Sequence, residues 1–141
     1  IGTLMYLANY TRPDIAFAVN LLARYSSSPT RRHWNRVKQI LCYLRGTMDM
    51  GLLYSNFPKP KLNRYADPGY LSNPHNGKSH IGYLFTNDGI AISWRSVKQI
   101  ISVTSSNHAE ILALHEASRE YVWLRFVIQH IRETCDLSFE K

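Results

Sequence analysis

The stretch Asn107–Ile131 (NHAEILALHEASREYVWLRFVIQHI) has the periodicity of a helix and carries a charge at the head of its apolar side. At about 100° per residue, five residues project within about 40° of Glu110: Leu114, Ala117, Tyr121, Leu124 and Ile128. Burial of an unpaired carboxylate is costly. We therefore expect Glu110 to shift its pKa, to cap the helix or to be matched by a cation.

The residues before this helix alternate with a period of two, which predicts strands. Asn87-Asp88-Gly89 is a strong hairpin signal between two of them. Turn residues occur at Pro68-Gly69 and at Asn73–Ser79, and 100–104 is a shorter extended run. The predicted strands are Leu62–Asp67, His80–Thr86 and Ile90–Arg95.

Asp67 ends the first strand, and Glu110 lies in the first turn of the helix. If the helix packs across that strand, the two carboxylates approach each other and offer hard oxygen ligands for Mg²⁺ or Mn²⁺. Two such ions, roughly 4 Å apart, stabilise the attacking and leaving oxygens of a phosphodiester. Two structural alternatives stay open: a capping box from Asn107 to Glu110, and a turn in which Asp67 precedes Pro68-Gly69.

The first third of the chain predicts two helices. Thr11-Arg12-Pro13-Asp14 is a start signal for a helix that runs to Tyr25, and Thr30 starts a second helix that Gly46 ends. Together they form a helical hairpin with a basic outer side, or a plain antiparallel pair whose arginines only keep it soluble. A short connector is expected at 55–61, where two prolines lie beside basic residues.

The charge of the chain is uneven. Residues 1–60 hold eight basic and two acidic side chains, whereas residues 61–141 hold nine and eight, so most of the net charge of +7 lies in the first part. A basic excess is typical of phosphate binding. The two cysteines indicate a reducing intracellular setting, and no run of about 18 apolar residues predicts a membrane span.

Several ordered motifs resemble one family. Residues 1–54, with TRPDI at 11–15, PTRRHW at 29–34 and YLRGT at 43–47, resemble the end of reverse transcriptase in copia-type retrotransposon Pol polyproteins. Four further motifs of this chain resemble the start of the RNase H domain in the same polyproteins: YAD at 65–67, GYLF at 82–85, ISWRS at 92–96 and SSNHAE at 105–110. The resemblance covers nearly the whole chain.

The resemblance implies roles for two acids. Asp67 matches the first metal-binding aspartate of the RNase H site, and Glu110 matches the helix glutamate. The third acid of the family and the fourth acidic or His position are expected beyond Lys141, and the polymerase aspartates before Ile1. Asp136 is expected to be a loop residue rather than a substitute, and Pro68 departs from the family pattern next to Asp67.

Other patterns are weaker. His108-Ala109-Glu110 is half of a zinc deaminase signature, but no P-C-x-x-C follows. Ser105 and Ser106 lack the acid and the elbow of a nucleophile site. The remaining histidines are expected at the surface or in turns, and core packing is expected for the tryptophans Trp34, Trp94 and Trp123.

The predicted fold class is α+β or α/β, with a reverse transcriptase helical region at 1–54, a connector at 55–61 and a truncated RNase H-like β-β-β-α domain at 62–141.

The expected parent activity is hydrolysis of RNA in RNA/DNA hybrids with Mg²⁺ or Mn²⁺. Two ions are expected in the complete site, and the fragment alone is expected to be inactive. A non-catalytic nucleic-acid-binding remnant and a structural scaffold are the alternatives. Expected partners are nucleic acid and the rest of the polyprotein, in a cytoplasmic particle or the nucleus. The expected phosphate contacts are Arg31, Arg32, Arg36 and Lys38.

Overall fold

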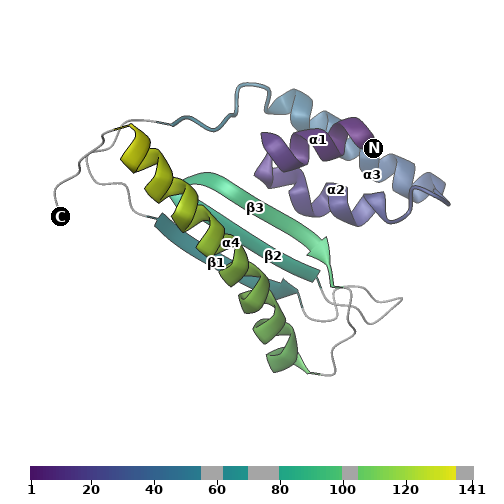
Figure 1. Ribbon diagram of the computed structural model, residues 1–141. Helices are drawn as coiled ribbons and strands as arrows, with labels where there is room; N and C mark the ends of the chain where they lie inside the picture. Colours follow the sequence, from purple (N-terminus) through teal and green to yellow (C-terminus); the bar gives the residue numbers. More distant parts are fainter. Residues whose placement is uncertain (55–61, 70–79, 100–104, 136–141) are drawn as a thin grey trace.

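The computed structural model describes residues 1–54, 62–69, 80–99 and 105–135, and within them helices precede and follow a three-stranded sheet (Figure 1). The mixed helix and strand class predicted from the sequence is confirmed. The elements in chain order are α1 (Gly2–Tyr10), the 3₁₀ helix η1 (Pro13–Ile15), α2 (Ala16–Ala23), α3 (Arg31–Gly46), β1 (Leu62–Gly69), β2 (His80–Asn87), β3 (Ile90–Lys98) and α4 (Ser106–Thr134).

Most predicted elements are present, with three differences. The sequence did not predict α1, and the first predicted helix begins as η1 before it continues as α2. β1 runs through Pro68 and Gly69, which pair with Ile81 and His80, so the predicted turn at Pro68-Gly69 is wrong. Proline is accepted there because β1 lies at an edge of the sheet formed by the described strands. The predictions for 55–61, 73–79, 100–104 and Asp136 lie outside the described residues.

The described strands form an antiparallel sheet in the order β1-β2-β3. Asp88 and Gly89 both have positive φ, 50° and 84°, in the turn between β2 and β3. This is the backbone that a tight hairpin requires and that Asp-Gly accepts at low cost. The hairpin predicted at Asn87-Asp88-Gly89 is therefore confirmed.

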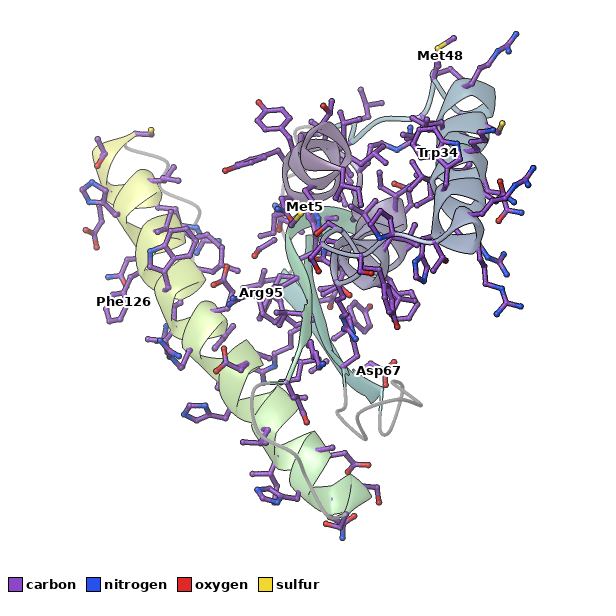
Figure 2. The ribbon with its side chains drawn as sticks, turned by 90° about the vertical axis from the view of Figure 1, so that its right-hand side faces the viewer. Met5, Trp34, Met48, Asp67, Arg95 and Phe126 are labelled. Carbon is purple, nitrogen blue, oxygen red and sulfur yellow. The ribbon has the colours of Figure 1, made fainter. Side chains whose placement is uncertain are left out.

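Helices cover the sheet on both faces. In Figure 2 the sheet is seen between α4 on one side and the α1–α3 group on the other. Alternation along the strands decides which side chains meet which layer. Tyr83 and Phe85 of β2 pack with Ala117 and Leu124 of α4. On the other face Trp94 of β3 packs against the helical core.

The helical group has its own core. Ala8 of α1 and Val19 of α2 are almost fully buried, and Val37 and Ile40 of α3 pack against the same cluster. This confirms that the two predicted helices pack as a pair and adds α1 to them.

A polar cluster joins η1 to the end of α3. Arg12 donates hydrogen bonds to the Asp14 carboxylate and, at 2.9 Å, to the carbonyl of Thr47. The Tyr43 hydroxyl donates to Asp14 at 2.8 Å. The hydrogen bond from Arg12 is the main cause that lowers the pKa of Asp14 below its usual 3.8. Asp14 therefore fastens η1 to α3.

Candidate carboxylate pair and nucleic-acid interface

Glu110 lies on α4 but not on its buried face. The side chains of α4 that are buried against the sheet are Ala109, Ala113, Ala117 and Leu124, whereas Glu110 and Leu114 are exposed. The prediction that Glu110 points into the core is therefore wrong. Ala117 and Leu124 of the predicted stripe are buried, but Ala109 and Ala113 are buried with them and shift the inward face to one side of the stripe. Small alanines let the helix backbone approach the sheet closely there, so Glu110 and Leu114 lie at the exposed edge of that face.

The capping alternative for Glu110 is also wrong. Ser105 is the N-cap of α4, and its hydroxyl accepts a hydrogen bond from the backbone N–H of His108 at 3.2 Å. Asn107 lies inside the first turn. Glu110 is thus neither buried nor part of a capping box, and its role as a metal ligand stays a prediction.

Asp67 is exposed near the end of β1, in register with Gly82 of β2. Its neighbour Ala66 pairs with Tyr83, which packs against α4. Because side chains alternate along a strand, Ala66 faces α4 and Asp67 faces the opposite side. Figure 2 labels Asp67 on the side of the sheet away from α4.

The two acids therefore border different hollows. Glu110 lines an open groove of about 650 Å³ between α4 and β1, together with Ala66 and Leu114. Asp67 lines a hollow of about 450 Å³ on the other face, beside Phe17 of α2. α4 packs mainly against β1, as expected, but the two carboxylates flank that strand from opposite faces.

The fit of a metal can be judged from these positions. Carboxylate oxygens are the ligands that Mg²⁺ and Mn²⁺ prefer. Within the described part of the chain, however, no group of three or more His, Cys, Asp or Glu side chains is placed to hold a metal ion. Asp67 and Glu110 thus have the right chemistry, but by themselves they do not form a metal site.

The predicted phosphate contacts lie on one exposed helix. Arg31, Arg32, Arg36 and Lys38 are all exposed on α3, whose buried residues are only Val37 and Ile40. Thr30 caps α3 as predicted: its hydroxyl accepts from the backbone N–H of His33, and the His33 ring accepts from the Thr30 N–H. The structure thus holds the four basic side chains on a capped helix that faces solvent.

Two of the three tryptophans are exposed, contrary to the prediction from the sequence. Trp34 on α3 and Trp123 on α4 are 56% and 57% exposed, so the prediction that they pack in a core is wrong for both. Trp94 is part-buried, and its indole N–H donates to the carbonyl of Ala8 at 2.7 Å. The helical period alone could not separate inward from outward aromatic positions, because both helices have apolar residues on several sides.

His80 is a buried residue that sequence reasoning missed, since it was expected at the surface or in a turn. It is 4% exposed at the start of β2. The Arg24 guanidinium at the end of α2 contacts its Nδ1, and its Nε2 lies 2.6 Å from the Ser96 hydroxyl. Burial, followed by the nearby Arg24 charge, lowers the pKa of His80 from 6.5 to about 4. The local sequence at the start of β2 is polar and does not indicate that His80 contacts α2.

In the ranges 1–54, 62–69, 80–99 and 105–135, no helix is both long and apolar enough to cross a bilayer.

Several proteins resemble this chain over most of its length. The secreted RxLR effector protein 161 of Plasmopara viticola is 40% identical over 124 residues, which are 88% of this chain and 87% of that protein. The retrovirus-related Pol polyprotein from transposon TNT 1-94 of Nicotiana tabacum is 41% identical over 131 residues, 93% of this chain. The Pol polyprotein from transposon RE2 of Arabidopsis thaliana is 38% identical over 124 residues, 88% of this chain. No protein-family model and no solved structure matches.

The relatives from transposons TNT 1-94 and RE2 define the class as retrotransposon proteins. The chain belongs to the family of retrovirus-related Pol polyproteins of copia-type transposons. It spans 8 to 10% of the length of the Pol polyproteins that it matches.

Proposed function

We propose that this chain is the part of a Pol polyprotein that joins the helical end of a reverse transcriptase to the first half of an RNase H-like domain. The main support for the proposal is the order of the elements that follow α3. Three antiparallel strands, β1 to β3, are followed by the helix α4, which packs along β1. Asp67 lies on that strand and Glu110 on that helix, as the resemblance implies. The proposed parent activity is hydrolysis of the RNA strand of an RNA/DNA hybrid.

Mg²⁺ or Mn²⁺ belongs to this proposal for the complete polyprotein, where the ions would stabilise charge on the scissile phosphate. The two carboxylates of this chain flank β1 from opposite faces and do not supply a metal site alone. We therefore expect little or no hydrolysis by the chain in isolation.

The test compares hydrolysis of a labelled RNA/DNA hybrid by the longest Pol reading frame that contains this chain. Asp67→Asn and Glu110→Gln should each abolish hydrolysis. Glu133→Gln, in the last turn of the same helix, and Asp49→Asn, an exposed acid outside the candidate pair, are the matched controls and should keep it. Full activity in either Asp67→Asn or Glu110→Gln would refute the assignment of these acids.

A second candidate function is nucleic-acid binding without catalysis, and the exposed basic side of α3 favours it. Arg31, Arg32, Arg36 and Lys38 are free of ion pairs with carboxylates among the contacts of the described residues. Among the described residues, the Arg36 guanidinium donates to the Gln39 side chain, at 3.0 Å, which is uncharged and keeps the guanidinium charge available for phosphate.

Binding is tested with the isolated chain and a labelled hybrid duplex at several salt concentrations. Each lost phosphate contact should reduce the slope of log affinity against log salt by about 0.9. Arg32→Ala combined with Arg36→Ala should reduce the slope by about 1 to 2. Arg125→Ala combined with Arg132→Ala on α4 removes the same charge elsewhere and should leave the slope unchanged. Equal changes in both double variants would refute a site on α3, and no binding at low salt would leave only a scaffold role.

A further inference from the structure

Trp34 lies outside the buried side of α3. The inward side of α3 consists of the buried Val37 and Ile40 and the half-buried Leu44. Trp34 projects from another flank and is 56% exposed. Leu41 lies seven residues further along the same flank and is 49% exposed, so two large, partly exposed apolar side chains follow each other along the helix.

Basic side chains run beside these two residues. Lys38 lies between them along the helix, and its Nζ is 5.8 Å from the centre of the Trp34 ring. Arg31 and Arg45 are seven residues before and after Lys38, so the three charges lie along one line, and both arginines are exposed. We call the set Arg31, Trp34, Lys38, Leu41 and Arg45 the Trp34 strip. It is about 21 Å long at 1.5 Å per residue.

An aromatic ring interleaved with basic side chains fits one class of ligand best. The basic side chains attract a phosphate backbone of any form, but an indole gains a partner only when a base is free of its own stack. In a duplex the faces of the bases are occupied by their neighbours. The charge of the strip and its exposed ring are therefore complementary to unpaired nucleotides.

We propose that the Trp34 strip binds single-stranded nucleic acid, with a base stacked on Trp34 and the phosphates held by Arg31, Lys38 and Arg45. This deepens the proposed nucleic-acid binding by α3 and rests on it. The strip adds a preference for an unpaired strand to a helix that binds phosphates without regard to pairing.

The test measures the affinity of the chain for a labelled oligothymidylate and for a hybrid duplex of the same length at one salt concentration. Trp34→Ala should weaken binding of the single strand about 5- to 150-fold, the range expected when one stacked base loses its aromatic partner. The duplex affinity should change less than twofold. Trp34→Phe, which keeps an aromatic face, should recover part of the loss.

Trp123→Ala is the matched control, because Trp123 is 57% exposed on α4 and should affect neither ligand. Circular dichroism of each variant checks that the helices are kept. Unchanged affinity of Trp34→Ala for the single strand, or equal losses for both ligands, would overturn the strip while duplex binding by α3 stands. If the unaltered chain binds neither ligand at low salt, the proposed binding function fails as well.

Discussion

On its α4 side the sheet is covered mainly by apolar contacts, with one short side-chain hydrogen bond from Ser93 to Glu120 at 2.7 Å, and on its other side polar contacts accompany the packing of Trp94. Ala109, Ala113 and Ala117 bring α4 close to the strands. On the other face, the Trp94 indole donates to the Ala8 carbonyl, and Arg24 contacts His80. Apolar contact is non-directional, whereas hydrogen bonds fix position. The α4 side therefore supplies most of the apolar burial, and the hydrogen bonds of Trp94 and His80 help to fix the position of the helical group on the opposite side.

The largest effect is expected on the α4 side, at Phe85. This side chain is fully buried, and its ring stacks on Tyr121 with centroids 6.4 Å apart. Phe85→Ala should lower the free energy of unfolding by about 3 to 5 kcal/mol, measured by urea denaturation. Phe126→Ala, at a residue of α4 that is 68% exposed, should change it by less than about 0.5 kcal/mol. Similar losses in both variants would mean that burial does not distinguish the two sides of α4.

The next effect concerns His80 and depends on pH. Its folded pKa of about 4 lies below its ordinary 6.5, so the unfolded chain takes up this proton at a higher pH than the folded chain. The stability contributed by neutral His80 is complete above about pH 6.5 and is lost as the pH falls towards 4. Between these values unfolding should become easier by about 1 to 2 kcal/mol, with solvent screening taken into account.

Urea denaturation of the chain and of His80→Gln at several pH values measures how the free energy of unfolding depends on pH. This dependence should be weaker in the variant. Asp14→Asn is the control, since the lowered pKa of Asp14 places its own contribution below pH 4 and should leave the slope above that value intact. A slope that persists in His80→Gln would assign the effect to another group.

A smaller effect is expected at Trp94. Trp94→Phe keeps an aromatic ring but removes the indole N–H, and the Ala8 carbonyl loses its donor. The free energy of unfolding should fall by about 1 to 2 kcal/mol. The exposed Trp123 serves as the comparison, and Trp123→Phe should have no measurable effect in the same denaturation experiment. No difference between the two variants would contradict a fixed contact on the α1–α2 side.

The smallest effect is expected at the start of α4. Ser105→Ala removes the side chain that accepts from the His108 N–H and should cost about 1 kcal/mol. Ser106→Ala lies one residue later, inside the helix, and should be close to neutral. Thermal unfolding followed by circular dichroism would detect the difference, and an equal shift of Tm in both variants would exclude Ser105 as the cap.

The sequence predicted the strands and long helices well because their signals are local. The Asp88-Gly89 turn, the Thr30 cap and the alternation of β2 are each decided by neighbouring residues. The short helix α1 was missed because it starts at Gly2, before any start signal in the chain.

The candidate site was less predictable because the faces of an element depend on what packs against it. Periodicity identified an apolar stripe on α4 but could not show that Ala109 and Ala113 shift the buried face to one side of it and leave Glu110 at the exposed edge. His80 is buried by α2, which is far from it in sequence, and Trp34 is exposed because the packed side of α3 is narrow. The roles of Asp67 and Glu110 in catalysis stay predictions.

The bond between Trp94 and Ala8 has a consequence for how the polypeptide can be divided. It connects residues on either side of the predicted connector, as does the contact of Arg24 with His80. Covalent continuity is therefore not the only attachment between the two parts. Two peptides that correspond to 1–54 and 62–141 have matching surfaces through which to reassemble after a single cleavage, as the halves of a split protein do.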